Sequence, residues 1–490
     1  MSAVDRVVVI GAGPAGLTAA YELDRAGVDF TVLEMDGVVG GLSRTVRHEG
    51  YRFDIGGHRF LTRVPAVEKM WREVLGDELL RRERRSTILY RGRRFAYPLR
   101  MGNVLRGLGP VYSLRALLSF IAAHLLPRRP ERSMEDWVTN RFGAFLYRTF
   151  FKTYTEKVWG IPCAEIGAEW AAQRIRGLSF ARAVQGALFP GRTRNIRSLA
   201  DAFDYPRLGP GQMWEATAAG LSAGDRVRLG AEVVSIRHSG GRVEAVVARD
   251  GAGEASHPAS HVISSMALRH LVEALDPPPP GAVLEAARSL RYRDFLTVAL
   301  VVDAAGLFAD NWLYVHDPEL RVGRIQNYGN WSPDLVADPG RSLLGLEYFC
   351  FEGDGVWSLS DAELVALARR EVEALGLVRA GSVAQGVVVR MRRAYPVYDH
   401  GLAQRLAVIR SYLELIPNLH PVGRNGLHRY NNQDHSMLTA MLAVRNILGE
   451  RHDVWGVNAE CEYLEEVHEE LRATAPGRVP APPLVLGEPA

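Results

Sequence analysis

The sequence predicts an α/β protein of several domains (α+β multidomain), combining a Rossmann-like nucleotide-binding domain, a helical insert and a mixed or antiparallel β-sheet substrate domain. At 490 residues, the chain is too long for a single hydrophobic core. A strand, a glycine turn, a helix and a second strand follow one another over residues 6–35, and strand-like stretches dominate from residue 226. With 47% hydrophobic residues, a mostly disordered chain is excluded.

Each element follows from a local pattern. Residues 6–10 form a β-branched strand, 14–26 a helix with small residues on one side, and 29–35 a second strand. Four prolines at 277–280 predict a stiff connector. Further strands are expected at 227–229, 233–237, 243–249, 261–265, 296–302, 311–315, 324–328, 343–351 and 386–390, and helices at 404–413 and 434–448. The expected domains are a discontinuous nucleotide-binding domain (1–90, 200–275 and 400–465), a helical insert (101–200), a β-sheet substrate domain (285–400) and a flexible tail (474–490).

Charge and cysteine content narrow the class of protein. The 59 basic and 56 acidic residues nearly cancel, which does not suggest a nucleic-acid partner. All but three of the basic residues are arginine, which indicates either a high-GC genome or a few arginines that grip phosphate with a bidentate fork. Three scattered cysteines give no disulfide framework and no metal cluster, so we expect a reducing, cytoplasmic location and no metal.

The most apolar helix candidate is 114–126, which carries Arg115 and is followed by Arg128 and Arg129. Its 13 residues are too few to span a bilayer, so no transmembrane segment is expected. A buried helix is the preferred interpretation, and peripheral contact with a membrane surface is the alternative.

The motif GAGPAG at residues 11–16 follows the first strand and opens the first helix, with Glu34 at the end of the second strand. Gly11 allows the tight turn, Gly13 lets the backbone approach a pyrophosphate, and Gly16 permits close packing of helix and strand. Ala15 lies in the first helical turn, whose free N–H groups and dipole attract phosphate. Glu34 can accept hydrogen bonds from ribose hydroxyls. These parts together predict a dinucleotide site.

The segment GGLSRT at residues 40–45 resembles the second glycine motif of the superfamily of FAD-containing amine oxidases, protoporphyrinogen oxidases and sugar mutases. The resemblance implies that the cofactor is FAD and that Gly41, Leu42 and Val233 contact it. A second GxGxxG does not occur downstream, so a separate nicotinamide-binding domain is not expected.

Four further segments resemble UDP-galactopyranose mutase: DIGGHRF (54–60), YTEKVWG (154–160), WLY (312–314) followed by Arg324, and GR (423–424) followed by Tyr430 and NQDHSM (432–437). The resemblance implies that Gly57 packs against the isoalloxazine and that His58 hydrogen-bonds near flavin N5 or a sugar hydroxyl. It implies substrate contacts from Tyr97, Arg100, Tyr154, Trp159, Tyr395 and Tyr430, and FAD contacts from Arg424, Gln433 and Ser436.

Two arginines match the phosphate-binding arginines of these mutases, Arg174 and Arg324. A pair of guanidinium groups can hold a diphosphate and stabilise the charge that develops on it. A surface or structural ion pair is the alternative for each. Arg100 stands where fungal-type mutases have glutamine, and Trp331 replaces a tyrosine in the strand that begins at Arg324, so the identity of the sugar and nucleotide stays open.

The resemblance implies an FAD-dependent enzyme that isomerises a nucleotide-diphosphate sugar between pyranose and furanose forms through a reduced-flavin N5–sugar adduct, and an NAD(P)H-derived reductant is the partner expected to reduce the flavin. The alternative is an FAD-dependent oxidase or desaturase of the amine oxidase or protoporphyrinogen oxidase type. A non-catalytic FAD-binding scaffold is the third hypothesis. The oligomeric state is left open.

Overall fold

The computed structural model describes residues 6–97, 109–168, 170–171, 198–199, 202–221, 226–458 and 466–467. The predicted site residues Arg100 and Arg174, and the expected tail 474–490, lie outside these ranges.

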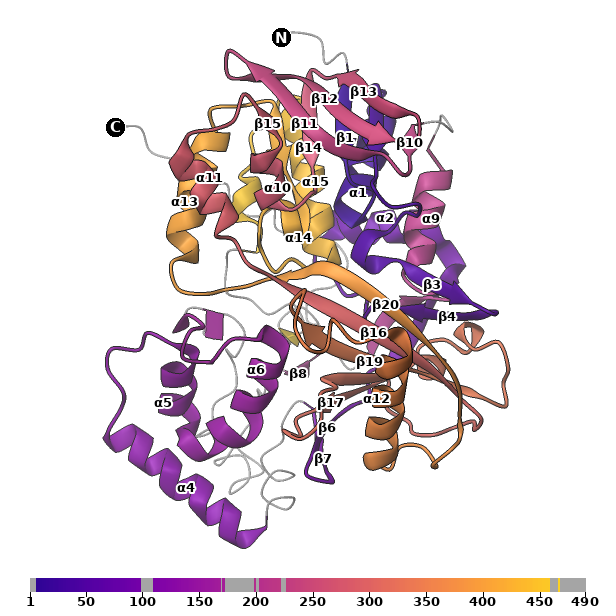
Figure 1. The fold of residues 1–490 in the computed structure, drawn as a ribbon, viewed down its shortest axis with the longest axis vertical. Coiled ribbons are helices and arrows are strands. Elements are labelled where there is room, and N and C mark those ends of the chain that lie inside the picture. The colour runs from indigo at the N-terminus through magenta and orange to yellow at the C-terminus, as the bar shows by residue number, and fades with distance from the viewer. Residues whose placement is uncertain are drawn as a thin grey trace, which may run out of the picture.

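The nucleotide-binding domain is built on five parallel strands in the order β10-β2-β1-β14-β21 (Figure 1). β1 and β2 are buried along their whole length and β14 at three of its four positions, as expected for parallel strands covered on both faces. Alternate residues of β1 face opposite layers. Val7 and Val9 pack on helices, whereas Val8 and Ile10 pack toward a second sheet, of order β13-β12-β11-β15. The strands are β1 Val7–Ile10, β2 Phe30–Leu33, β10 Val227–Arg228, β11 Glu232–Ser239, β12 Arg242–Asp250, β13 Gly253–Pro258, β14 His261–Ser264, β15 Leu275–Asp276 and β21 Leu419–Pro421.

Helices cover this domain and complete its Rossmann-like layering. Helix α1 begins in the glycine motif and packs side by side with α15, which comes from the other end of the described chain. The predicted α/β class is therefore confirmed, and its nucleotide-binding unit brings together segments that are far apart in the sequence. The helices are α1 Pro14–Arg25, α2 Pro65–Leu75, α9 Gly211–Ala219, α10 Leu268–Glu273, α11 Gly281–Arg288, α13 Leu402–Leu413, α14 Gly423–Gly426 and α15 Gln433–Ile447.

The second large unit is a seven-stranded sheet in the order β20-β16-β19-β18-β17-β6-β7. It is antiparallel except where β17 pairs in parallel with β6. One face packs on α12 and the other faces the helical insert. Strands β6 and β7 precede the helical insert in the sequence, so this sheet includes residues outside the range 285–400 that was expected for the substrate domain. The elements are β6 Ser86–Tyr90, β7 Arg93–Ala96, β16 Tyr292–Val302, β17 Trp312–Val315, β18 Arg324–Asn327, β19 Ser342–Cys350, β20 Val383–Pro396 and α12 Asp361–Ala374.

The helical insert contains α4 (Pro110–Leu125), α5 (Met134–Leu146), a π-helical turn (Tyr147–Lys152) and α6 (Thr153–Trp159). It lies at the lower left of Figure 1, with α4 outermost. The expected burial of the 114–126 helix is wrong, because its large apolar side chains are exposed and only Ala116 and Ala123 are buried.

Short elements join these units. Two-stranded pairings link β3 with β4, β5 with β9, and β8 with β22. Their bounds are β3 Thr45–His48, β4 Tyr51–Asp54, β5 Leu79–Glu83, β8 Ser198–Leu199, β9 Ala202–Pro206 and β22 Glu466–Val467, and the 3-10 helices are Gly41–Ser43, Gly76–Glu78, Tyr328–Asn330, Pro333–Leu335 and Val454–Gly456.

A buried carboxyl group, Asp54, makes the stability of the core depend on pH. Asp54 is fully buried and accepts a hydrogen bond of 2.5 Å from the Tyr205 hydroxyl. Burial raises the pKa of Asp54 from 3.8 to about 8, so the folded protein binds a proton that the unfolded chain releases above pH 4. We expect the free energy of unfolding to fall as pH rises from about 4 to about 8, by at most ~1.4 kcal/mol per pH unit from this group.

Denaturant unfolding of wild type and Asp54→Asn at pH 5 and pH 8 measures this contribution. Asp54→Asn should flatten the dependence over this range, whereas Asp338→Asn, at an exposed position, should leave it as in wild type. An unchanged slope in Asp54→Asn would assign the pH dependence to other groups.

Candidate functional site

A cavity of about 1130 Å³ lies between the parallel sheet and the seven-stranded sheet. Its lining comes from the glycine motif, the β2 end, the GGH loop at 56–58, β17, β18, β20 and the start of α15. Residues from positions 10 to 436 thus meet in one space, whose volume is slightly above the range of about 300–1,000 Å³ that is typical of small-molecule and cofactor sites.

At one end of the cavity, the Glu34 side chain organises the turn after β1. Its Oε2 accepts from the backbone N of Ala12 at 2.6 Å, and its Oε1 accepts from that of Asp36 at 2.8 Å. Burial raises the pKa of Glu34 despite these two donors. Glu34 and Val233 both line the cavity. Glu34 therefore both holds the turn after β1 and borders the space where a ribose would lie.

The glycines leave room for a pyrophosphate. Gly11 has φ +95°, which favours glycine, and Gly13 faces Gly41 so closely that a Cβ on Gly41 would lie 3.3 Å from the Gly13 Cα. A Cβ on Gly16 would lie 1.7 Å from the Gly11 carbonyl oxygen, so Gly16 allows α1 to pack against the turn. Gly16 is absent from the described cavity lining, whereas Gly11, Gly13, Ala15 and Gly41 line it. These features fit a dinucleotide cofactor.

The start of α15 closes the wall beside the GGH loop. Gln433 and Ser436 line the cavity, and the helix begins directly after Asn432, whose backbone N donates to His435 Nδ1 at 3.3 Å. The positive end of the α15 dipole therefore lies at the cavity and favours negative charge there.

The GGH loop packs on Trp312. A Cβ on Gly57 would lie 1.9 Å from the Trp312 ring, so only glycine permits this contact. His58 Nδ1 donates to the Gly56 carbonyl at 3.1 Å, since a carbonyl can only accept. Burial, with the positive charge of Arg424, lowers the pKa of His58 to about 4. His58 is therefore neutral near pH 7, and its Nε2 is left as a hydrogen-bond acceptor.

Arg324 is held rigidly at the cavity wall. Its Nε donates to the Tyr154 hydroxyl at 2.7 Å, and its Nη1 lies 3.1 Å from Glu347 Oε2. The antiparallel pairing of β18 with β19 puts Arg324 directly opposite Glu347, whose other oxygen accepts from Gln326 at 2.5 Å. Burial opposes the charge on Arg324, but Tyr154 and Glu347 hold its pKa well above the ordinary value. The guanidinium is thus permanently cationic and fixed in direction.

Arg424 is a second fixed cation. Its Nε donates to the Asn431 carbonyl at 2.8 Å and its Nη1 to the Ala394 carbonyl at 3.0 Å. Its guanidinium lies 5.2 Å from the Tyr395 ring and 5.1 Å from the Tyr430 ring, and these two rings stack. Within the described part of the chain, no carboxylate lies within ion-pair distance of Arg424. Its charge is therefore available to a ligand.

The predicted substrate residues fall into two groups. Tyr395 and Tyr430 line the cavity, and burial raises the pKa of Tyr395 to about 12. Tyr97, Tyr154 and Trp159 are absent from the described lining. They lie one layer behind it: Tyr97 stacks on Tyr314, Tyr154 bonds Arg324, and Trp159 packs on Tyr395 and Tyr430. In the described structure these three side chains support residues that line the cavity, and their direct contact with a substrate stays a prediction.

Trp331 does not belong to the strand in which it was expected. β18 ends at Asn327, and Trp331 follows a 3-10 turn in the core, where its Nε1 donates to the Asn311 carbonyl at 2.9 Å. It is fully buried against Tyr205 and is absent from the described lining, so this departure from the mutase pattern does not reach the cavity.

Sequence reasoning missed three residues of the site. Arg59 lines the cavity and lies 5.3 Å from the Trp312 ring, and Arg84 lines it and stacks on Tyr97. Glu347 is fully buried and anchors Arg324. Arg59 adjoins the GGH motif, which was a usable signal. A lone glutamate in an apolar strand, as at Glu347, was another, because a buried carboxylate needs a cation.

Comparison with protein families gives a match to flavin containing amine oxidoreductases over residues 14–423. The chain belongs to this family. It is an FAD-dependent enzyme, and the part of the cavity next to Gly13, Gly41 and Glu34 has the room and the backbone geometry that fit a dinucleotide. Residues 98–108 and 172–197 fall within the matched range but outside the described structure.

Curated relatives are oxidoreductases by name. Protoporphyrinogen oxidase 2 of Arabidopsis thaliana is 45% identical over 62 residues, 13% of this chain and 12% of that protein. A Mycobacterium tuberculosis protein that carries the name of a flavin-containing monoamine oxidase is 28% identical over 296 residues, 56% of this chain and 60% of that protein. The chain thus spans less than two thirds of the length of these relatives.

Solved structures share the fold. Reduced UDP-galactopyranose mutase superposes with a TM-score of 0.82 at 21% identity, covering 94% of this chain and 99% of that one. Putrescine oxidase with bound putrescine gives 0.62 at 19% identity, covering 91% and 99%. The resemblance seen in the sequence motifs therefore extends to the whole architecture.

Proposed function

We propose that the enzyme acts on a nucleotide-diphosphate sugar and isomerises it between pyranose and furanose forms. The observation that carries the proposal is Arg424, a half-buried cation that donates to two backbone carbonyl groups and lies over the rings of Tyr395 and Tyr430, with no carboxylate within ion-pair distance among the described residues. A fixed cation beside aromatic rings is suited to a phosphate group next to a sugar.

The charge of the cavity argues against an amine substrate. We call the region lined by Arg59, Trp312, Arg324, Tyr395 and Arg424 the arginine end of the cavity. Arginine side chains lie over aromatic rings at this end: the Arg324 guanidinium is 5.2 Å from the centre of the Trp312 ring. A protonated amine would be repelled here, whereas a diphosphate would be attracted.

The side chains at the arginine end have distinct roles in this reaction. Arg324 and Arg424 hold the diphosphate and stabilise the negative charge that increases on it as the sugar–phosphate bond breaks. Neutral His58 accepts a hydrogen bond from a sugar hydroxyl through Nε2. The α15 N-terminus, which lies at the cavity, would favour negative charge on a flavin ring bound beside it. Reduced FAD, when bound, supplies a nucleophilic ring nitrogen for the anomeric carbon, and an NAD(P)H-derived reductant would keep it reduced.

A second candidate, an FAD-dependent oxidoreductase, is supported by the names of the curated relatives. It would use the same cavity and transfer a hydride to oxidised FAD. The cations at the arginine end then indicate an anionic substrate, such as a carboxylate or phosphate ester, rather than an amine.

An anaerobic screen of UDP-, GDP- and dTDP-sugars separates the two. We expect one nucleotide sugar to be converted to its ring isomer by dithionite-reduced enzyme only, with no net change in flavin redox state and no hydrogen peroxide when air is admitted. Bleaching of oxidised flavin by a nucleotide sugar, in proportion to product, would establish the oxidoreductase instead. Failure of every nucleotide sugar to bind reduced enzyme would overturn the substrate class.

A further inference from the structure

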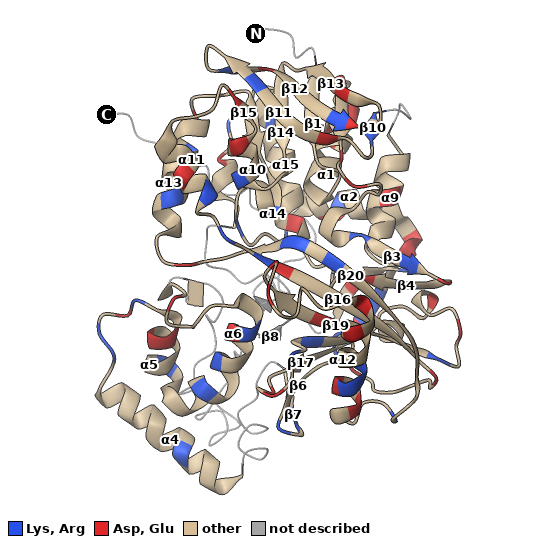
Figure 2. Ribbon diagram, viewed as in Figure 1, with Lys and Arg blue, Asp and Glu red and all other residues tan. Residues whose placement is uncertain are grey.

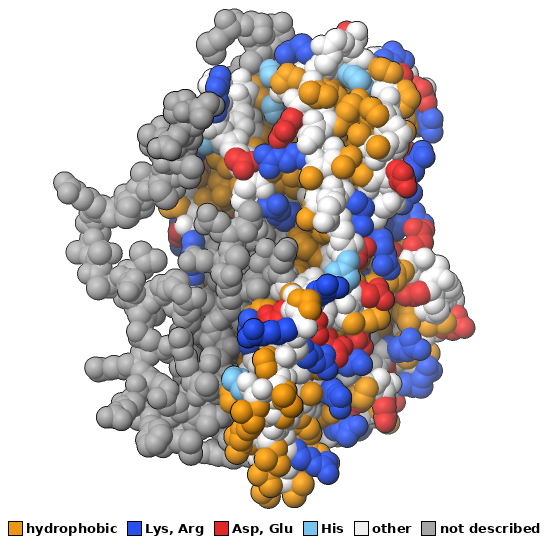
Figure 3. All heavy atoms as spheres, turned by 90° about the vertical axis from the view of Figure 1, so that its left-hand side faces the viewer, with side chains coloured by type: hydrophobic (Ala, Val, Ile, Leu, Met, Phe, Trp, Pro, Cys, Tyr) orange, Lys and Arg blue, Asp and Glu red, His pale blue; other side chains and the backbone are white. Residues whose placement is uncertain are grey.

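Helix α4 presents a continuous apolar face outward. Figure 3 shows this face at the lower end of the molecule as a dense group of hydrophobic side chains. Leu114 and Leu118 are each 57% exposed and Leu125 is 74% exposed, values that are unusual for leucines four and seven positions apart on one face of a helix. The exposed large apolar residues of this region are Val111, Tyr112, Leu114, Leu117, Leu118, Ile121, Leu125 and Leu126.

Packing against α5 forces this orientation. The inward positions of α4 are small, with Ala116 and Ala123 buried and Ser119 Oγ accepting from the Phe145 backbone N at 3.0 Å. The two backbones approach so closely that a Cβ on Gly143 of α5 would lie 2.7 Å from the Phe120 backbone N. Rotation of α4 to bury its leucines would drive large side chains into this contact, so the apolar face is exposed in the packed protein.

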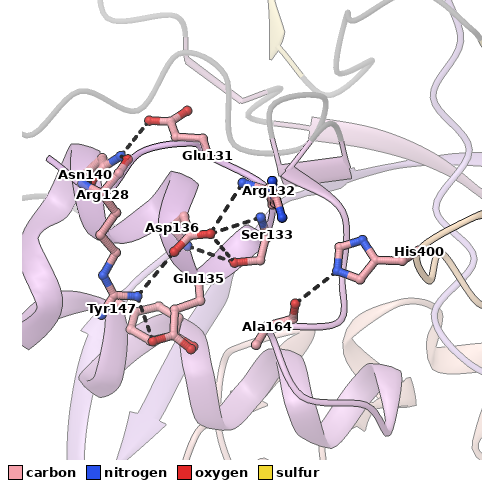
Figure 4. Close-up of polar contacts among 10 residues, drawn as sticks. All are labelled: Arg128, Glu131, Arg132, Ser133, Glu135, Asp136, Asn140, Tyr147, Ala164 and His400. Atoms are coloured by element: carbon pink, nitrogen blue, oxygen red, sulfur yellow. Dashed lines mark hydrogen bonds and ion pairs between the residues drawn. The ribbon is translucent and has the colours of Figure 1, made fainter.

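The loop after α4 is fixed by hydrogen bonds, so the helix is not loosely attached (Figure 4). Asn140 Oδ1 accepts from the Arg128 backbone N at 2.8 Å, and Asn140 Nδ2 donates to the Arg128 carbonyl at 3.0 Å. The Arg128 guanidinium lies 2.9 Å from Glu135 and 3.4 Å from Asp136. Ser133 is the N-cap of α5: its hydroxyl oxygen accepts from the Asp136 backbone N, and the Asp136 carboxylate accepts from the Ser133 backbone N. At the other side of the insert, His400 bonds the Ala164 carbonyl at 3.1 Å.

Helix α4 and the residues directly after it carry positive charge only. From Pro110 to Pro130 the chain contains Arg115, Arg128 and Arg129 and no acidic residue. The first carboxylates beyond it, Glu131, Glu135 and Asp136, are all paired with arginines. In Figure 2 the α4 ribbon carries no acidic residue and little charge of either sign. Arg115 on the helix and Arg129 just beyond it are both exposed. Such a surface complements anionic phosphate groups, and it would oppose an identical arginine-bearing surface of a second copy.

We propose that α4 anchors the enzyme to the surface of an anionic membrane. The helix lies in the plane of the interface, with its leucines inserted at the boundary of the acyl chains and with Arg115 and Arg129 at the level of the lipid phosphates. Its 16 residues make a helix about 24 Å long, which suits this orientation. Among the described helices, none is long and apolar enough to cross a bilayer. This inference does not depend on which substrate the cavity binds.

Co-sedimentation of the full-length, flavin-loaded protein with lipid vesicles tests the proposal. We expect binding to phosphatidylcholine vesicles that contain about one third phosphatidylglycerol, and at least about tenfold weaker partitioning for the double variant Leu118→Glu/Ile121→Glu. The matched control is Leu229→Glu/Leu415→Glu, at positions 44% and 67% exposed outside α4, which should partition as wild type does. Flavin absorbance and circular dichroism report that each variant is folded.

A charge-reversal variant tests whether the arginines contact the lipid phosphates. Arg115→Glu/Arg129→Glu should weaken binding to the phosphatidylglycerol vesicles several-fold and make it insensitive to salt. Wild-type protein that stays in solution with these vesicles would overturn the proposal, as would a Leu118→Glu/Ile121→Glu variant that binds like wild type. A dimer in gel filtration that this double variant dissociates, without vesicle binding by wild type, would assign the face to a second copy.

Discussion

Replacing Arg324 by alanine is expected to lower kcat/KM for the nucleotide sugar by about 100-fold or more, which corresponds to ~2.7 kcal/mol or more of lost stabilisation. Arg324 is the cation whose direction is fixed on two sides, by Tyr154 at 2.7 Å and Glu347 at 3.1 Å. Alanine removes the charge that would face the departing diphosphate. The UDP affinity, measured from changes in flavin absorbance, should fall with kcat/KM.

Glu347 determines how this experiment must be controlled. It is fully buried, and alanine at position 324 would leave it without its cation, which destabilises a protein independently of any role in catalysis. The double variant Arg324→Ala/Glu347→Gln removes both charges, and we expect it to fold, bind flavin and stay inactive. Arg249→Ala, which breaks an exposed ion pair at 2.7 Å, should change kcat/KM by less than about twofold. UDP affinity in the double variant equal to that of wild type would remove Arg324 from the substrate site.

The variant Gly13→Val is expected to lose bound flavin without losing its fold. Gly13 precedes α1 with φ −82° and ψ −171°, which valine adopts without strain, and a Cβ there would lie 3.8 Å from the Gly41 Cα. The added side chain therefore fits the protein but occupies the space that the pyrophosphate needs. We expect FAD affinity to drop by about 100-fold or more, so that the protein purifies largely without flavin.

Gly37→Val is the matched control. Gly37 is exposed, lies in the same region of the chain, and a Cβ there would meet nothing within 4 Å. It should retain flavin at the wild-type ratio of visible to ultraviolet absorbance. The thermal midpoints of the two apoproteins should agree within a few degrees. Stoichiometric FAD in purified Gly13→Val would show that the cofactor lies elsewhere.

The nucleotide-binding half could be read from the sequence because its signals are local. The β1–α1–β2 unit, its three glycines and Glu34 occupy 28 consecutive positions from Val7 to Glu34, where hydrophobic period and turn chemistry specify the backbone directly. The motif at 432–437 was equally compact, and its helix begins where Asn432 predicts. The segments around Arg324 and Tyr395 were placed by resemblance to mutases, and both residues line the cavity.

The role of each charged side chain depends on contacts that form on folding. Arg324 and Arg424 look alike in the sequence, but the pairing of β18 with β19 gives Arg324 a carboxylate, whereas the described contacts of Arg424 are with carbonyl groups and tyrosine rings. The orientation of α4, with its leucines toward solvent, likewise follows from its close packing at Gly143. An apolar helix has the same sequence pattern whether it is buried or exposed, so the pattern alone could not give this orientation. The family fold and the glycine turn could be predicted from the sequence, because they depend on neighbours along the chain. The contacts of Arg424 and the exposed apolar face of α4 depend on residues that meet only after the chain has folded, which is why local patterns could not reveal them.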